Sequence, residues 1–309
     1  MENEIIRRIL ANVSKVIVGK DREIIDILKG ILSGGHILIE DLPGLGKTTI
    51  VKALAKTMDL SFARIQFTPD LLPSDITGIS IYNQKEMNFE FRKGPVFANL
   101  VLADEINRTS PKTQSALLEV MEEAQVSEGS VSYVLDKPFV VLATQNPIEY
   151  EGTFNLPEAQ LDRFMMKTSV GYPDKEQEMN ILRNFRLRNP LDHLTPVVSR
   201  QDILDLMEGV HQVAVADAIN DYIVRLADET RSSNLLSIGV SPRASLALMR
   251  LSQATALIQG RSYVIPEDVK ENVMLCFPHR VKLSSLGRTK NLSEPQVIAS
   301  ILQYVKAPR

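Results

Sequence analysis

The segment Glu40–Thr49 carries the residues with the clearest chemical meaning in this chain. Its sequence, EDLPGLGKTT, follows the apolar stretch Ile37–Ile39 and precedes a helix-like stretch, so a strand, a glycine loop and a helix are expected in succession. Such a loop turns backbone N–H groups toward an anion at the positive end of the helix. We expect a nucleoside triphosphate with Mg²⁺ here, the ammonium of one lysine on the outer phosphates and one threonine hydroxyl on the metal. The expected contacts come from Pro43, Gly44, Leu45, Gly46, Lys47, Thr48 and Thr49, of which Lys47 and Thr48 play those two parts.

One position of this loop departs from the usual pattern. In G-x-x-x-x-G-K-[ST] the first glycine would stand at position 41, where this chain has Asp41. The departure leaves room for a loop that binds nucleotide without appreciable turnover. The remaining alternative is a chance Gly/Lys turn before a helix, which the flanking strand and helix patterns disfavour.

Two adjacent acids follow a second apolar strand. Residues 99–103 read Asn-Leu-Val-Leu-Ala, and Asp104 and Glu105 come next. At the end of a strand in the same sheet, Asp104 would lie near Mg²⁺ and Glu105 could orient an attacking water. Two solvated acids at a strand end are the alternative, but their combination with the phosphate loop favours hydrolysis over binding alone.

Composition sets outer limits on the kind of protein. The 309 residues are 44% hydrophobic and 24% charged, which is the amino-acid composition of an ordinary globular protein. The net charge of −3 and the pI near 5.9 argue against a surface that binds nucleic acid over most of its area. Cys276 is the single cysteine and lies in an apolar run, so a buried thiol in a reducing compartment is expected. The four histidines do not fall in a metal-ligand spacing, so Mg²⁺ bound with nucleotide is the only metal expected. Without a leader-like start or a membrane-length apolar run, we expect a soluble, cytoplasmic protein.

Hydrophobic periodicity predicts two domains. Strands alternating with helices predict a mainly parallel sheet covered on both faces, and two alternating segments within it predict hairpins. The expected strands are 37–39, 64–67, 100–102 and 139–142, the helices 5–17, 21–32 and 112–123, and the hairpins 79–91 and 126–135. After residue 174 strand patterns fade and helix starts follow, at Ser199, Ser241, Pro266 and Ser293. We expect a nucleotide-binding domain at 1–190 and an all-helical domain at 191–309.

Longer motifs make a resemblance specific. The phosphate loop, ADEINRTSPKTQSALLE at 103–119, ATQNP at 143–147 and LPEAQLDRF at 156–164 together resemble the MoxR family of AAA+ ATPases over essentially the whole chain. The resemblance implies an α/β fold, an αβα core with two hairpin insertions and a helical lid. It also implies Mg²⁺-dependent ATP hydrolysis in a homo-oligomeric ring, usually a hexamer. The implied work is chaperone-like, in maturation of protein complexes or cofactor insertion, with partners that can carry a von Willebrand factor A domain.

The resemblance also implies roles for individual residues. Asn146 corresponds to the sensor-1 residue that helps place the hydrolytic water, and Arg163 to the arginine finger that reaches a neighbouring subunit's site. Arg243 corresponds to sensor 2, which contacts the γ-phosphate of its own subunit. Val18 and Gly19 stand where adenine packs.

Plainer readings remain open for these residues. They are an Asn-Pro turn at Asn146, a surface ion pair of Arg163 with Asp162 or Glu158, a solvated Arg243 and an apolar helix end at Val18 and Gly19. The sequence does not decide whether Arg108 faces a neighbouring subunit or pairs with a nearby acid.

Two other functions stay open. A nucleic-acid motor would need basic residues on the hairpins; Lys85, Arg92 and Lys93 are present but Glu86 and Glu90 offset them. A nucleotide-dependent switch with little turnover would fit the Asp41 departure. No residue identifies a client protein.

Overall fold

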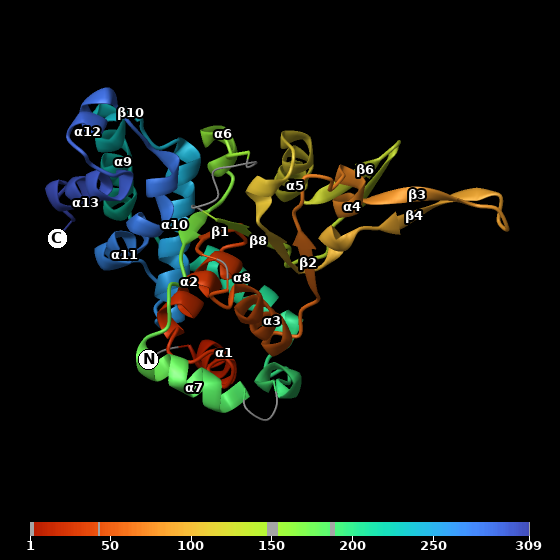
Figure 1. The fold of residues 1–309 in the computed structure, drawn as a ribbon. Helices are drawn as coiled ribbons and strands as arrows, with labels where there is room; N and C mark the ends of the chain where they lie inside the picture. The colour runs from red at the N-terminus through yellow and green to blue at the C-terminus, as the bar shows by residue number, and fades with distance from the viewer. Residues whose placement is uncertain (1–2, 43, 147–153, 186–188, 309) are drawn as a thin grey trace.

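A five-stranded parallel sheet forms the centre of the first domain. The computed structural model describes residues 3–42, 44–146, 154–185 and 189–308. The strand order is β2-β5-β8-β1-β9, and every neighbouring pair is parallel, as predicted (Figure 1). The strands are β1 (Ile37–Glu40), β2 (Phe62–Gln66), β5 (Leu100–Asp104), β8 (Val140–Gln145) and β9 (Met166–Thr168).

Alternating side chains give the sheet two buried faces. Ile37 and Ile39 pack with the helices α1 (Glu4–Val13), α2 (Asp21–Leu32) and α3 (Lys47–Thr57). Leu38, between them, points to the other face and packs with α5 (Pro111–Glu123). This period of two in strands that are buried on both sides explains their continuously apolar sequences. The predicted αβα core is confirmed.

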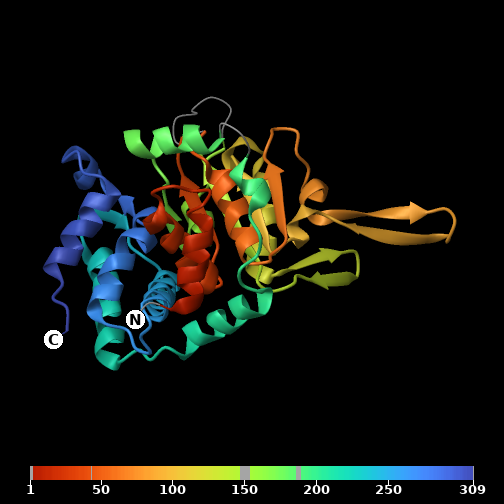
Figure 2. The same ribbon diagram turned by 90° about the horizontal axis from the view of Figure 1, so that it is seen from below.

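Two antiparallel hairpins decorate the core where the sequence predicts them. The first, β3 (Gly78–Asn83) and β4 (Asn88–Lys93), follows the short helix α4 (Pro73–Thr77) and projects far from the body (Figures 1 and 2). The second is β6 (Gln125–Glu128) with β7 (Val131–Val134). The Phe91 ring stacks on that of Tyr133 at 4.2 Å between centroids, which joins the bases of the two hairpins. Toward the tip Met87 and Phe89 are 78% and 72% exposed.

Helices make up most of the second domain, and their starts match the predicted N-caps. The Ser199 and Ser241 side chains accept hydrogen bonds from backbone N–H groups of the first turns that follow them. The helices here are α8 (Arg200–Gln212), α9 (Asp217–Ser232), α10 (Pro242–Ile258), α11 (Pro266–Cys276), α12 (Ser285–Thr289) and α13 (Glu294–Tyr304). A short antiparallel pair, β10 (Leu236–Ile238) and β11 (Lys282–Leu283), is an element that the helix-only prediction missed. These two- and three-residue strands are too short to leave an alternating pattern.

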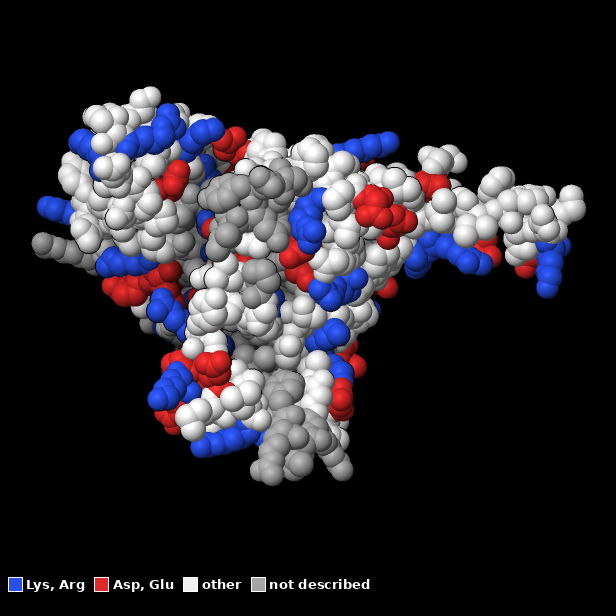
Figure 3. All heavy atoms as spheres, viewed as in Figure 1, with Lys and Arg blue, Asp and Glu red and all other residues white. Residues whose placement is uncertain are grey.

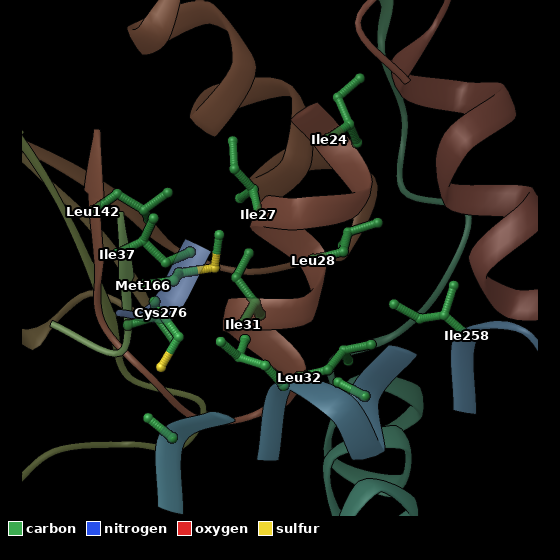
Figure 4. Packing of buried hydrophobic residues seen from close by; sticks show 14 of the residues in the cluster. Ile24, Ile27, Leu28, Ile31, Leu32, Ile37, Leu142, Met166, Ile258 and Cys276 are labelled. Carbon is green, nitrogen blue, oxygen red and sulfur yellow. The ribbon is translucent and has the colours of Figure 1, made fainter. Parts of the chain in front are cut away.

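The two domains share one hydrophobic core. Ile27 and Ile31 of α2 belong to one continuous cluster with Ile37 and Leu142 of the sheet and with the lid residues Ile258 and Cys276 (Figure 4). Lys29 of α2 is 1% exposed, and its Nζ lies 2.5 Å from a Glu271 carboxylate oxygen on α11. The predicted boundary between residues 190 and 191 stays a prediction. In the part of the chain that the structure describes, no helix is both long and apolar enough to cross a membrane.

His36 links three elements and predicts a pH dependence of stability. Its Nδ1 accepts a hydrogen bond from the Val141 N–H (3.0 Å), and its Nε2 lies 2.8 Å from the Met121 carbonyl oxygen. A neutral ring protonated on Nε2 satisfies both partners. Burial is the main cause that lowers the pKa of His36 from 6.5 to about 4. The unfolded chain therefore takes up a proton near pH 6.5 that the folded chain takes up only near pH 4, so the free energy of unfolding should fall as pH falls through this range.

Urea unfolding at pH 7.5 and pH 5 measures this effect. We expect His36 to account for about 2 kcal/mol of lost stability between these pH values. His36→Gln should be less stable at pH 7.5 but should lose less on acidification. A residual slope is expected because burial also lowers the pKa of His279. Equal losses in wild type and variant would contradict the assignment to His36.

Candidate active site

The carboxyl ends of the strands open onto one polar cavity of about 350 Å³. Residues from four places in the chain meet there because neighbouring parallel strands end at the same edge of the sheet. The lining consists of loop residues 44–49 with Arg64, Gln66, Asp104, Glu105 and Asn146. Lys47, Thr48, Asp104, Glu105 and Asn146 were all predicted for this site, and the structure brings them together.

The loop between β1 and α3 has the conformation of a phosphate cradle. Gly44 and Gly46 have φ values of +85° and +83°, in the left-handed region that glycine adopts at little cost. Gly46 is also the N-cap of α3. The backbone N–H groups of the first helical turn, which have no acceptor within the helix, therefore point toward the cavity. Pro43 was predicted to contribute, and it lies outside the described residues.

Asp41, the departure from the motif, has a different task from a loop glycine. Its φ is not positive, so its conformation does not require glycine. Its carboxylate accepts hydrogen bonds from the backbone N–H groups of Val170 and Gly171 (3.2 Å for Gly171), which ties the loop to the segment after β9. Lys47 Nζ donates to the Asp41 carbonyl oxygen (2.9 Å). Burial lowers the pKa of Lys47, and the carboxylates of Asp41, Asp104 and Glu105 oppose that shift.

The two acids at the end of β5 are held by neighbouring side chains. The Thr144 hydroxyl donates to Asp104 Oδ1 (2.7 Å) and accepts from the Glu105 backbone N–H (2.8 Å). Glu105 has φ of +60°, an uncommon value for a non-glycine residue, which turns its side chain out of the strand direction. Its Oε2 accepts from Gln66 Nε2 (3.0 Å) and pairs with Arg108 (2.9 Å). Arg108 therefore pairs with an acid of its own chain in this structure.

The donor set fits a magnesium ion that arrives with nucleotide. Among the described residues there is no cluster of three or more His, Cys, Asp or Glu able to hold a metal alone. Thr48 and Asp104, which line the same cavity, offer one hydroxyl and one carboxylate. Mg²⁺ keeps several waters and uses one or two protein oxygens beside the phosphates, so this sparse set suits it.

A second, largely apolar hollow of about 190 Å³ continues the cavity. It shares Gly44, Leu45, Gly46 and Thr49 with the polar part. Val18, for which contact with adenine stays a prediction, lines it with Val16, Ile17, Ile50, Pro173 and Ile181. Gly19 stands beside it, and its carbonyl oxygen accepts a hydrogen bond from Gln177 Nε2 (3.1 Å). An apolar hollow joined to an anion-binding loop is the shape that a nucleotide requires.

Asn146 directly follows β8 and lines the polar cavity beside Glu105. Its carbonyl oxygen lies 3.5 Å from Asn107 Nδ2, which connects the ends of β5 and β8. An amide side chain at this place can donate and accept, which suits a water-positioning task. That role remains a prediction.

Arg163 and Arg243 lie together at the opposite edge of the sheet. Arg163 pairs with one oxygen of Glu122 (3.0 Å) and Arg243 with the other (3.3 Å). Both line a pocket of about 250 Å³ with Gly34, Gly35 and His36, which precede β1, whereas the phosphate loop follows β1. Neither is among the residues that line the nucleotide cavity.

This placement corrects two details of the sequence analysis. Arg243 was expected at the γ-phosphate of its own subunit, but the amino end of α10 packs over the amino ends of the strands. The Asp162 carboxylate accepts a hydrogen bond from Ser241, the N-cap of α10 (2.9 Å), and pairs with Arg280 (2.9 Å), which fixes α10 there. Arg163 does form an ion pair, but its partner is Glu122 and not Asp162 or Glu158.

Sequence reasoning missed several residues of these sites. Arg64 and Gln66 lie on β2, next to β5, and contact Asp104 and Glu105. Their spacing of two on a strand would have placed both on one face, but only the pairing of β2 with β5 shows which acids they meet. Glu122, near the end of α5, carries no motif that singles it out.

Comparison with known proteins agrees with the fold. The family described as "ATPase family associated with various cellular activities (AAA)" matches residues 36–166, and the AAA lid domain matches 228–301. The chain is 48% identical to "Uncharacterized protein YeaC" of Bacillus subtilis, over 96% of this chain and 93% of that protein. It is 42% identical to "Chaperone MoxR1" of Mycobacterium tuberculosis, over 98% of this chain and 82% of that one.

A solved structure extends the comparison to three dimensions. A protein of Cytophaga hutchinsonii, described as a candidate ATPase, superposes with a TM-score of 0.92 at 45% identity, covering 99% of this chain and 95% of that one. The long, well-covered match to Chaperone MoxR1 and the two matched domains establish the class, including ATP hydrolase activity. The chain belongs to the MoxR family of AAA+ ATPases.

Proposed function

We propose that the protein hydrolyses ATP with Mg²⁺ in a ring in which each active site is completed by the neighbouring subunit. The observation that carries this proposal is the separation of the predicted machinery. Lys47, Asp104, Glu105 and Asn146 line the nucleotide cavity, whereas Arg163 and Arg243 lie beyond the other end of β1. Since both arginines share Glu122, they are suited to enter a neighbour's site together. We therefore reassign Arg243 from its own subunit's nucleotide to the neighbour's.

Each residue then has a defined task. The loop N–H groups and Lys47 bind the phosphates, and Thr48 and Asp104 hold the metal, which when bound neutralises phosphate charge. Glu105 and Asn146 orient the attacking water toward the γ-phosphate. The neighbour's Arg163 and Arg243 stabilise charge that develops on the transferred group.

α5 provides a physical link between the two edges. Its amino end follows the acid-bearing turn, where the Ser110 side chain caps the helix, and its carboxyl end carries Glu122. The helix has 13 residues and is about 20 Å long. A change at Glu105 can thereby reach the arginines that serve the next subunit.

The work of this cycle is proposed to be chaperone-like remodelling of protein complexes. The relative from Mycobacterium tuberculosis is named a chaperone. We propose six subunits per ring, clients in complex maturation or cofactor insertion, and a partner carrying a von Willebrand factor A domain. A nucleic-acid motor has less support, because Glu86 and Glu90 offset two of the three basic residues on the first hairpin, which are Lys85, Arg92 and Lys93. Acidic and basic side chains also intermingle on the face shown in Figure 3.

Turnover measured against assembly tests the ring. ATP hydrolysis per subunit should rise at least tenfold as protein concentration passes the range in which the mass, measured in the same samples, shifts from monomer to ring. The reason is that a monomer lacks its neighbour's arginines. Equal turnover per subunit in monomer and ring would contradict the shared site.

A further inference from the structure

Arg64 lies against the predicted magnesium ligand. Its Nε and one terminal nitrogen both donate to Asp104 Oδ2, at 3.0 and 2.6 Å. The same terminal nitrogen lies 2.5 Å from Gln66 Oε1, which holds the guanidinium in place. The Arg64 side chain is 45% exposed and that of Asp104 only 13%, so the arginine stands on the open side of the carboxylate.

These contacts occupy both oxygens of Asp104. Oδ1 accepts from the Thr144 hydroxyl (2.7 Å), and Oδ2 accepts twice from Arg64. A carboxylate oxygen has two lone pairs, so little capacity remains on Oδ2. A metal ion that approaches Oδ2, directly or through one of its waters, therefore has to displace at least one Arg64 contact.

The pairing of charges in the cavity also relates Arg64 to the metal. Asp104 is paired with Arg64 and Glu105 with Arg108, so among the described residues that line the polar cavity Lys47 is the cation left to meet the triphosphate. Without Arg64, the Asp104 carboxylate would repel the phosphates until a metal neutralised it. The arginine thus does electrostatically what the metal does when it is bound.

We propose that Arg64 is a positioning residue that competes with Mg²⁺ for Asp104 and keeps the site able to accept nucleotide before the metal is in place. This inference rests on the proposed nucleotide site. It predicts that Arg64 sets the coupling between metal and nucleotide, defined as the ratio of the ATP dissociation constant in EDTA to that in saturating Mg²⁺.

Binding of a fluorescent ATP analogue to wild type and Arg64→Gln, with and without Mg²⁺, measures that ratio. In the variant the dissociation constant should rise about tenfold in EDTA and less than about threefold in Mg²⁺, so the ratio increases. Arg64→Lys, which keeps the charge, should restore part of the wild-type ratio. Arg225→Ala, which removes an arginine from a surface pair with Asp221 on α9, is the control and should leave the ratio within about twofold.

Several results would contradict the competition between Arg64 and Mg²⁺, and each has a different meaning. An unchanged ratio in Arg64→Gln, or equal weakening in EDTA and Mg²⁺, would overturn the competition. A shift in Arg225→Ala as large as that in Arg64→Gln would assign the effect to the net charge of the protein and would also overturn it. Thermal unfolding of each variant identifies a folding defect, and Arg64→Lys then carries the test. A wild-type protein that binds no ATP in either condition would overturn the proposed function itself.

Discussion

Arg163→Ala is expected to lower ATP turnover per subunit by about a thousandfold while nucleotide binding is kept. Arg163 does not line the nucleotide cavity of its own chain, and its guanidinium is held by Glu122 at 3.0 Å. Its removal therefore leaves the binding residues intact and takes away only charge stabilisation in the neighbour's transition state. Steady-state hydrolysis at saturating ATP measures the loss, and mass measurement confirms that rings still form.

Mixed rings separate an action across the interface from an action within one chain. Lys47→Ala subunits cannot bind nucleotide well but keep Arg163, and Arg163→Ala subunits keep a complete cavity. Mixing the two inactive proteins should restore part of the activity at interfaces where a complete cavity meets a complete arginine. Arg225→Ala, which breaks a surface pair with Asp221 on α9, is the matched control and should retain full turnover. No rescue in intact mixed rings would mean that Arg163 does not act in trans.

Glu105→Gln should keep ATP bound while turnover falls by about a hundredfold or more. An amide of the same shape can still reach the hydrogen-bond partners Gln66 and Arg108 in part, but it cannot polarise or accept a proton from the attacking water. The φ of +60° at this residue fixes the direction of the side chain, so the substitution changes chemistry more than geometry. Single-turnover hydrolysis and retention of labelled ATP after gel filtration measure the two halves of this prediction.

Glu119→Gln is the control for that substitution, because Glu119 is exposed on α5 and away from the cavity lining. It should bind and hydrolyse ATP as wild type does. Normal turnover in Glu105→Gln would remove the water-orienting role from Glu105. Loss of ATP binding in that variant would instead show that the residue supports the nucleotide itself.

Local sequence patterns were sufficient for most of the fold. The glycines and Lys47 between an apolar strand and a helix predicted the phosphate cradle because its geometry depends on a few consecutive residues. Four of the five strands of the central sheet, both hairpins and the serine N-caps were also predicted, since each depends on alternation or capping within a short window; the three-residue strand β9 was not predicted. The β10–β11 pair was missed because its short strands are specified by contacts between residues 44 and 47 positions apart, not by a local pattern.

At Asp41 the observed backbone conformation explains a residue that the motif does not predict. The pattern predicts glycine at this position, yet the chain passes through it without positive φ, and the carboxylate serves as an acceptor for Val170 and Gly171. The substitution therefore replaces a conformational role with a tie to the segment that follows β9. This contact joins residues 129 and 130 positions apart in the chain, so only the folded structure shows it.

The sequence by itself determined the chemistry that each residue type can perform: an anion cradle, two acids at a strand end, an amide, and two arginines in recognisable motifs. Tertiary structure alone decided which of these groups meet. It placed Arg64 on Asp104, paired Arg163 and Arg243 on Glu122, and put α10 over the edge of the sheet opposite the phosphate loop. The physical reason is that hydrogen-bonding and charge capacity belong to each side chain, whereas distances between side chains far apart in sequence depend on strand order and on how the lid packs.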